Sequence, residues 1–362
     1  MSFSQDTFIK MAKEQQHSEE FINICIAYAN HLQSKNLPVI FTRAHLGMIL
    51  GINNISHIIL NRNAHYKFYE IKKRNGKGFR QIVTPYSNLK FIQQYIQGEI
   101  LAKIEVGTHA NGFVKGKSIV SNATPHQRTE AILNLDLSRF FDSIRERRVY
   151  GIFRSIGYAK NLAVDLAKLC TVELPEAYLD TFAEKELHAY RRIVRPGDAV
   201  LPQGAPTSPT LSNLILRRLD RRLNGLAQKQ AVNYTRYADD ITFSGSLNNL
   251  PPIKLIRHII KSEGLNINWD KVGIFRKGRR QVVTGLTISD GLHVPRSFKK
   301  EVKKHLHCCV KFGVEAHLHF LGISEKKFYK EWLLGKIYYI KAVEPAFAET
   351  LLKDFNTIAW PL

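Results

Sequence analysis

The order of apolar and polar positions divides the chain into a helical start, a mixed centre and a helical end. The start has apolar side chains at helical spacing. Residues 66–71 and 79–83 then alternate as strands do, and the basic turn between them contains Asn75 and Gly76, a strong hairpin signal. Residues 87–101 return to helical spacing. The pattern predicts helices, then a basic β-hairpin, then another helix.

Strand patterns and acidic residues come together in the centre of the chain. A mostly apolar run leads directly into Asp136. Residues 232–237 and 241–244 are strand-like on either side of a short turn that contains Asp239 and Asp240. The pattern therefore predicts a hairpin with two carboxylates at its tip and a third carboxylate at the end of another strand.

Helical patterns fill most of the remaining sequence. One helix is predicted to begin at Ser208-Pro209, because proline is favoured at the first helical position. Beyond Gly291 the pattern is helical and basic, with helices predicted over 297–312, 325–341 and 344–358. Strands in the centre and helices at both ends predict an α+β fold.

The net charge of the chain predicts the kind of partner that it binds. The chain has 362 residues, 53 Lys and Arg against 31 Asp and Glu, and a formal net charge of +22. Such an excess predicts a polyanionic partner, because each phosphate that a basic side chain neutralises releases bound counterions. The alternative is a basic surface that serves only solubility or meets acidic lipids. It is disfavoured because the basic residues are spread over the chain.

The cysteines and the hydropathy pattern predict a compartment. Cys25, Cys170, Cys308 and Cys309 show no spacing typical of a disulfide framework, so free thiols in a reducing cytoplasm are expected. No apolar run approaches the length that spans a bilayer, and no secretory signal is evident. We therefore expect a cytoplasmic protein with no membrane partner.

The three aspartates predict a chemistry. Adjacent carboxylates such as Asp239 and Asp240 repel each other unless a cation neutralises them. A solvated turn is the alternative for this pair, and a helix N-cap is the alternative for Asp136. Three carboxylates on neighbouring strands would bind two hard cations about 4 Å apart, as nucleotidyl transfer requires. The interpretation we favour is a site for two Mg²⁺ ions.

Three short motifs follow one another in the order found in the palm of reverse transcriptases. Residues 136–141 begin with Asp and end with Phe, residues 201–204 are Leu-Pro-Gln-Gly, and residues 237–240 are Tyr-Ala-Asp-Asp. The chain resembles this family over roughly residues 68–288. The resemblance implies a right-hand polymerase fold of α+β type, with fingers, a palm built on an antiparallel sheet, and a helical thumb.

The resemblance also implies an activity and a domain division. It implies an RNA-directed DNA polymerase whose two Mg²⁺ ions are held by Asp136, Asp239 and Asp240, helped by the carbonyl group of Leu137. The implied parts are an N-terminal helical region, fingers with palm, and a helical thumb that binds RNA, over 1–60, 61–290 and 291–362.

Further roles are implied residue by residue. Phe141 would lie under the sugar of the incoming dNTP and exclude a 2′-hydroxyl. Gln203 and Gly204 would pack on the nascent base pair, Arg80 would hold the triphosphate, and Lys271 would lie near the leaving pyrophosphate. Alternatives remain open: a core Phe at position 141 or at the preceding position, and a simple surface charge at position 80.

Two further motifs resemble signatures of bacterial retron polymerases. Asn122 and His126 occur in Asn-Ala-Thr-Pro-His, and Val283, Thr284 and Gly285 form Val-Thr-Gly. These five residues are predicted to take part in RNA binding, with a local cap and a satisfied polar pair as the alternative for Asn122 and His126. Intron-type and abortive-infection reverse transcriptases remain alternatives, as does a non-catalytic RNA-binding protein on the same fold.

The retron resemblance implies partners. They are a structured non-coding RNA from the same locus, the branched RNA-linked DNA primed from a 2′-hydroxyl of a guanosine in it, dNTPs and an effector protein in antiphage defence. Residues 171–200 are longer than the family's usual link and are interpreted as an insertion that contacts the effector or the RNA. The His and Cys residues of 305–319 match no zinc module, so packing and RNA contact are favoured over zinc.

Overall fold

The computed structural model describes residues 3–72, 79–323 and 327–361. The chain folds into two compact units, each assembled from separate stretches of sequence. The first contains Met1–Phe113, Leu137–Leu223 and Ile253–Asn268, and the second contains Val114–Asp136, Asn224–Pro252 and Trp269–Leu362. The predicted division into an N-terminal region, fingers with palm, and thumb stays a prediction.

The first unit begins with helices, as predicted. Ser4, Ser18 and Thr42 cap the first three of them by accepting a hydrogen bond from a backbone N–H in the first turn. The elements up to the first strand are α1 (Gln5–Glu14), α2 (Glu19–Gln33), α3 (Arg43–Leu50), α4 (Ile55–Leu60) and η1 (Arg62–His65).

The predicted basic hairpin follows these helices. Strands β1 (Tyr66–Lys72) and β2 (Phe79–Pro85) pair antiparallel over their whole lengths. The turn residues Asn75 and Gly76 lie outside the described residues. The predicted helix after the hairpin is α5 (Ser87–Tyr95), which continues as the π-helical segment η2 (Ile96–Ile100) and the short 3₁₀ turn η3 (Leu101–Lys103).

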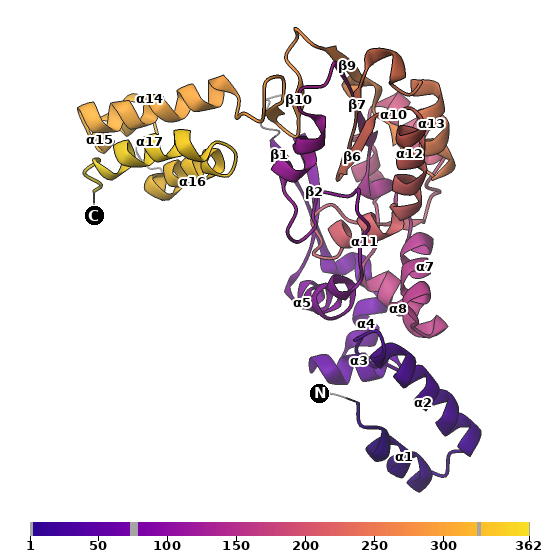
Figure 1. Cartoon of the computed structure of the whole chain (residues 1–362). Helices are drawn as coiled ribbons and strands as arrows, with labels where there is room; N and C mark the ends of the chain where they lie inside the picture. Colours follow the sequence, from indigo (N-terminus) through magenta and orange to yellow (C-terminus); the bar gives the residue numbers. More distant parts are fainter. Residues whose placement is uncertain (1–2, 73–78, 324–326, 362) are drawn as a thin grey trace. The chain divides into compact units, whose positions relative to one another are not determined.

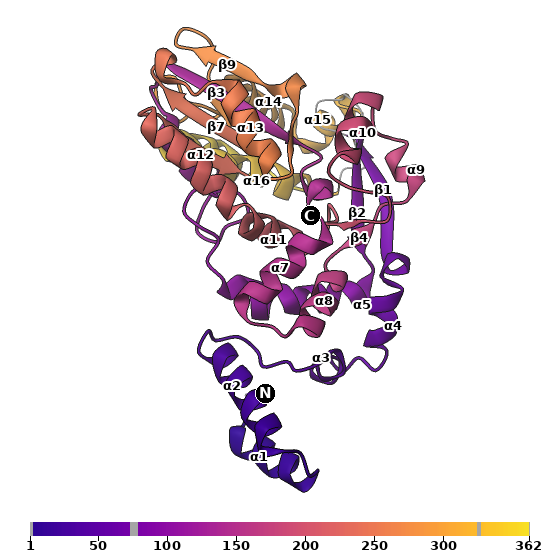
Figure 2. The same cartoon turned by 90° about the vertical axis from the view of Figure 1, so that its right-hand side faces the viewer.

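The rest of the first unit is largely helical (Figure 2). The predicted helix beginning at Ser208 is two helices, since the backbone leaves helical geometry at Leu216. The remaining elements are η5 (Phe141–Ser143), α7 (Glu146–Ile156), α8 (Lys160–Leu169), β4 (Val172–Glu173), α9 (Glu176–Leu179), α10 (Glu184–Arg191), β5 (Ala199–Val200), α11 (Ser208–Ile215), the start of α12 (Arg217–Lys229), α13 (Ile253–Ser262) and β8 (Asn266–Ile267).

The second unit is built on an antiparallel sheet. Strand β7 (Asp240–Gly245) pairs with β6 (Asn233–Tyr237) on one side and with β3 (Ala131–Ser138) on the other, and β9 (Gly273–Arg276) pairs with β3. The unit's shorter elements are α6 (Ile119–Ala123), η4 (Thr124–His126), η6 (Leu247–Asn249), η7 (Trp269–Lys271), β10 (Val282–Val283) and β11 (Leu286–Thr287). Strands and helices together confirm the α+β class.

The helical end of the chain forms a bundle of its own (Figure 1). Its core contains fully buried apolar side chains such as Val302, Leu333, Ile337 and Ile340. The predicted helix over 325–341 appears as a helix that begins at Tyr329, because Phe328 has a left-handed backbone, with φ 59°, that a helix cannot continue through. The first two residues of the prediction lie outside the described residues. The helices are α14 (Arg296–Phe312), α15 (Val314–Phe320), α16 (Tyr329–Lys341) and α17 (Pro345–Asn356).

None of the helices in the described ranges combines the length and the apolar character that a membrane span requires.

Candidate active site

The hairpin of β6 and β7 ends in the two adjacent carboxylates, as predicted. Tyr237 pairs with Asp240, so Ala238 and Asp239 form a two-residue turn. Ala238 has φ 57°, the positive value that such tight hairpin turns need at their first central position. On the next strand, Asp136 lies directly opposite Asp240. The structure therefore brings the three carboxylates together at the turn end of the hairpin. Asp136 does not end its strand as predicted, because β3 continues to Ser138 and pairs there with β8.

A buried arginine supports this turn, and the sequence pattern did not identify it. The side chain of Arg236 is wholly buried, and its Nη1 donates a hydrogen bond of 3.0 Å to the carbonyl oxygen of Ala238. A buried guanidinium needs acceptors around it. The available signal was a charged residue in a strand whose other residues are uncharged, one position before the Tyr-Ala-Asp-Asp sequence.

The carboxylates are crowded enough to change one another's ionisation. Desolvation first, and then the negative charges of Asp239 and Asp136, raise the pKa of Asp240 to about 7, although the residue as a whole is exposed. Lys271 offsets part of this charge, because its Nζ donates a hydrogen bond of 2.6 Å to Oδ2 of Asp136. Desolvation lowers the pKa of Lys271, but that bond and the three carboxylates raise it more, so the net shift is upward. The structure thus places Lys271 at the carboxylates.

The donor set fits hard divalent cations. Asp136, Asp239 and Asp240 offer only carboxylate oxygens, which Mg²⁺ prefers. Desolvation is the largest cause of the raised pKa of Asp240, and repulsion by Asp239 and Asp136 comes next. A divalent cation would neutralise that repulsion. Within 3–72, 79–323 and 327–361, no group of three or more His, Cys, Asp or Glu side chains is arranged so that it could hold a metal ion. The ammonium group of Lys271 lies against Asp136 instead.

Four of the five predicted nucleotide-binding residues lie in the first unit, and Lys271 lies in the second. Two of these four, Gln203 and Gly204, contact the basic hairpin. The carbonyl oxygen of Gln203 accepts a hydrogen bond of 2.9 Å from the backbone N–H of Val83 on β2. Gly204 has φ 141°, and a Cβ there would lie 2.9 Å from the carbonyl oxygen of Val83. Arg80 is exposed on the same strand. The close approach explains why residue 204 is glycine.

The two adjacent phenylalanines have different surroundings. Phe140 is buried, with 5% of its surface exposed, and serves as the core residue. Phe141 is half-buried, and its ring centroid lies 5.0 Å from that of Phe140 and 6.4 Å from that of Phe113. This difference leaves Phe141 as the ring that a sugar could reach. Leu137 is buried on β3, where it pairs with Ile267.

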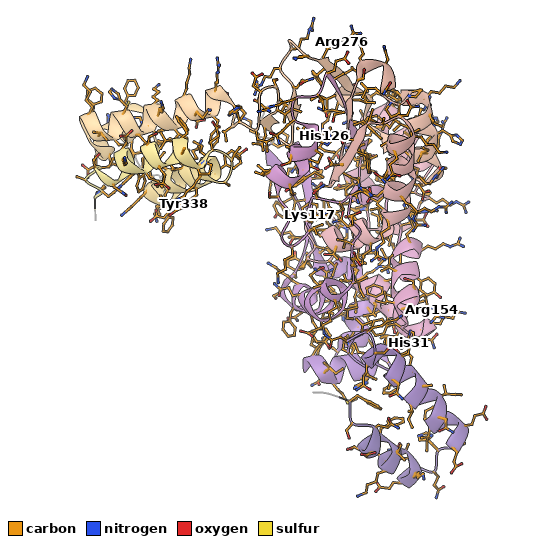
Figure 3. The ribbon with its side chains drawn as sticks, in the orientation of Figure 1. His31, Lys117, His126, Arg154, Arg276 and Tyr338 are labelled. Carbon is orange, nitrogen blue, oxygen red and sulfur yellow. The ribbon has the colours of Figure 1, made fainter. Side chains whose placement is uncertain are left out.

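Asn122 and His126, which form the first retron-like signature, contact the strands β6 and β7 of the acidic hairpin. His126, labelled in Figure 3, has no exposed surface, and its Nδ1 lies 2.7 Å from Oγ of Ser244 and its Nε2 2.8 Å from Oγ1 of Thr235. Thr235 also donates to the carbonyl oxygen of Asn122, at 3.4 Å. Burial lowers the pKa of His126 to about 4, so the ring is neutral at physiological pH. These contacts satisfy the ring of His126, whereas Oδ1 of Asn122 is buried without a hydrogen-bond partner in the described part of the chain. RNA binding by Asn122 and His126 stays a prediction.

The second signature forms a tight hairpin turn. Val283 pairs with Leu286, and the two residues between them, Thr284 and Gly285, have φ values of 45° and 83°. Positive φ at both central positions defines a type I′ turn. Oγ1 of Thr284 donates to the carbonyl oxygen of Ile119, at 3.3 Å, which holds the turn against α6. RNA binding by this triplet also stays a prediction.

The histidines and cysteines near the end of the chain form a packed cluster. Nδ1 of His305 lies 2.9 Å from Nε2 of His317 and 2.9 Å from the hydroxyl oxygen of Tyr329. The sulfur of Cys309 lies 3.7 Å from the same hydroxyl group. Trp332 packs edge-on against His305, with ring centroids 5.1 Å apart. These contacts agree with the packing role that the sequence favoured.

Comparison with known proteins names the family. The family described as "Reverse transcriptase (RNA-dependent DNA polymerase)" matches residues 71–324. The retron Mx65 reverse transcriptase of Myxococcus xanthus is 34% identical over 328 residues, which cover 88% of this chain and 72% of the relative. The retron Ec86 reverse transcriptase of Escherichia coli is 34% identical, covering 71% of this chain and 74% of the relative.

A second Myxococcus xanthus protein, the retron Mx162 reverse transcriptase, is also 34% identical, and this chain spans 54% of its length. The chain belongs to the reverse transcriptase family of RNA-directed DNA polymerases and, within that family, to the retron reverse transcriptases. The right-hand polymerase fold predicted from the motifs is the fold of this family, and that prediction is confirmed.

Proposed function

We propose that the chain copies a structured RNA from its own locus into RNA-linked single-stranded DNA, starting from a 2′-hydroxyl of a guanosine in that RNA. The observation that supports catalysis most directly is the register that sets Asp136 opposite Asp240, next to Asp239. A non-catalytic RNA-binding protein would not need three carboxylates at one point. The similarity to retron reverse transcriptases supports the choice of template and product.

Two Mg²⁺ ions are the proposed cofactors. Asp136, Asp239, Asp240 and the carbonyl group of Leu137 would hold them, and the ions would supply activation of the attacking hydroxyl and stabilisation of the phosphoryl charge. The ammonium group of Lys271 lies within hydrogen-bond distance of Asp136, where it offsets part of the negative charge and can reach a leaving pyrophosphate. The hydrogen bond from Arg236 to the carbonyl oxygen of Ala238 holds the turn that contains Asp239.

The incoming dNTP is proposed to meet four residues of the first unit. Arg80 binds the triphosphate, and Gln203 and Gly204 pack on the nascent base pair, for which the absence of a Cβ at Gly204 allows close backbone approach. The half-buried ring of Phe141 lies under the sugar and excludes a 2′-hydroxyl. These contacts would make DNA the product.

The proposed partners follow from charge and from the family. A net charge of +22 suits a structured RNA and the DNA copied from it. Exposed aromatic side chains among basic residues on the helical end, such as Tyr338 on α16, could stack on unpaired bases (Figure 3). An effector protein and a role in antiphage defence complete the proposal.

The test is to express the chain with its native flanking DNA and to isolate the small nucleic acids that accumulate. Wild type is compared with Asp239→Asn and with Asp290→Asn, which neutralises an exposed aspartate outside the site. We expect a discrete single-stranded DNA, shortened by RNase, in wild type and Asp290→Asn and not in Asp239→Asn. Absence of this species from wild type, with DNA synthesis on an added primed RNA intact, would contradict the retron product.

A further inference from the structure

The insertion at residues 171–200 folds as a closed element of the first unit. Strands β4 and β5 pair at its two ends, with Val172 opposite Val200. Between them, Arg191 on α10 donates a hydrogen bond of 2.8 Å to Glu176 on α9. The element leads directly into the Leu-Pro-Gln-Gly sequence that contains Gln203. It is therefore an ordered element that lies in the sequence between two predicted dNTP-binding residues, Phe141 and Gln203.

This element holds Arg139, two positions before Phe141, through an ion pair with Glu186. Arg139 has φ 46°, a left-handed backbone that arginine does not favour without support. Its guanidinium forms a bidentate pair with Glu186 on α10, at 2.9 and 3.0 Å, and lies 3.6 Å from the ring centroid of Phe182. Ser138 donates to the same carboxylate, at 3.2 Å. Glu186 and Phe182, both in the insertion, thus stabilise the left-handed backbone of Arg139.

A second contact holds the residue that follows Phe141. Asp142 is 4% exposed, and its Oδ2 accepts a hydrogen bond of 3.1 Å from the hydroxyl group of Tyr178 on α9. Its Oδ1 is buried without a hydrogen-bond partner in the described part of the chain. A buried carboxylate with one unsatisfied oxygen is costly, so its position depends on the group that does contact it. That group again belongs to the insertion.

The same element contacts the basic hairpin. Phe68 on β1 packs edge-on against Tyr178, with ring centroids 6.0 Å apart, and α9 lies beside β1 (Figure 2). The aromatic contacts continue from Tyr178 to Phe182 at 5.6 Å and from Phe182 to Tyr190 at 5.2 Å. The insertion therefore joins the hairpin that carries Arg80 to the loop that carries Phe141.

We propose that residues 172–200 are a clamp that holds the loop 138–142 in the shape that binds a dNTP, with Glu186 and Tyr178 as positioning residues. The proposal rests on the proposed contact of Phe141 with the dNTP sugar. The clamp sets the affinity for dNTP and the discrimination against ribonucleotides, and it leaves the carboxylates themselves unchanged. Loosening it moves the ring of Phe141 while chemistry at saturating dNTP continues.

The test uses the full chain, an RNA template and a supplied DNA primer. Glu186→Ala is expected to raise the KM for dNTP about tenfold, to lower kcat by less than about threefold, and to increase relative use of ribonucleotides about tenfold. Glu186→Gln, which keeps one acceptor oxygen, is expected to be intermediate. The matched control is Glu184→Ala, an exposed glutamate in the first turn of the same helix, which should behave as wild type.

Two results would overturn the clamp. One is a Glu186→Ala variant that matches Glu184→Ala in both KM and sugar discrimination. The other is a loss of kcat with both quantities unchanged, which would mean a merely structural role. If Glu186→Ala does not fold, Tyr178→Phe decides by the same criteria, because it removes a single hydroxyl group.

The supplied primer separates this test from the retron product. Extension of that primer does not depend on self-priming from an RNA of the same locus, so the clamp can be judged where the retron product is absent. Phe141→Ala in the same assay tests the sugar contact itself. Unchanged discrimination in Phe141→Ala would contradict that contact, and the KM of Glu186→Ala would still report on the clamp.

Discussion

Asp240 lies next to the carboxylates of Asp136 and Asp239, so its pKa depends on the charges of both. Its pKa is raised from 3.8 to about 7, so the folded chain binds this proton more tightly than the unfolded chain does. The stability that this proton contributes is complete below about pH 4 and is lost as the pH rises through about 7. A divalent cation would restore it at high pH by replacing the proton.

Mg²⁺ binding should therefore depend on pH. Below pH 7 the first Mg²⁺ ion must displace the proton of Asp240, so its affinity is expected to rise about tenfold for each pH unit and to level off above about pH 8. Calorimetric titration with MgCl₂ at several pH values measures this. Asp136→Asn should shift the rise to lower pH, because it removes one of the charges that raise the pKa of Asp240. A flat profile in wild type would contradict the shared site.

Gly204 lies close against the backbone of β2. Gly204→Ala places a Cβ 2.9 Å from the carbonyl oxygen of Val83 at φ 141°, and it is expected to cost about 1–3 kcal/mol of unfolding free energy. Gly225→Ala is the control, because nothing lies within 4 Å of its Cβ, and it should gain up to about 1 kcal/mol as a helical alanine. Urea denaturation measures both. Equal stability of the two variants would contradict the close approach.

At the scale of elements, His126 joins η4 to both strands of the acidic hairpin. His126→Ala would remove the ring that contacts Ser244 and one of the two hydrogen-bond partners of Thr235 in the interior, so a loss of about 2–4 kcal/mol is expected. His307→Ala, on an exposed histidine, should stay within about 0.5 kcal/mol of wild type. If His126→Ala also stayed within about 0.5 kcal/mol of the wild-type unfolding free energy, His126 would not join η4 to the hairpin in the way described.

The ionisation of His126 adds a dependence on pH. Burial lowers its pKa from 6.5 to about 4, so the folded chain favours the neutral ring. The stability that the neutral ring contributes is complete above about pH 6.5 and is lost as the pH falls toward 4. Denaturation midpoints of wild type should fall over this range, and those of His126→Gln should fall less.

Local patterns predicted the elements, and long-range contacts decided the rest. The strand pattern on both sides of Asp239 predicted the acidic hairpin, and the helical spacing of residues 87–101 predicted α5. The burial of Arg236 and the contact between Asp142 and Tyr178 could not be predicted, because each depends on a partner chosen by the tertiary fold. The break at Leu216 was also missed, since the apolar spacing continues through it.

At the scale of the whole molecule, the net charge of +22 predicts how RNA binding responds to salt. If some six to ten phosphates are neutralised, affinity for a structured RNA hairpin should fall roughly 10³- to 10⁵-fold between 50 and 200 mM salt. Fluorescence anisotropy at several salt concentrations measures the slope. Affinity that does not change with salt would mean that the basic surface is not the RNA-binding surface.

The central claim is that Asp136, Asp239 and Asp240 together catalyse RNA-templated DNA synthesis. The most direct measurement is the single-turnover rate of dNTP addition to a primer on an RNA template with Mg²⁺, for wild type, the three Asp→Asn variants and Asp290→Asn. Each of the three site variants should lose at least about a hundredfold in rate, and Asp290→Asn should match wild type. A variant of Asp136, Asp239 or Asp240 that keeps the wild-type rate would contradict the account.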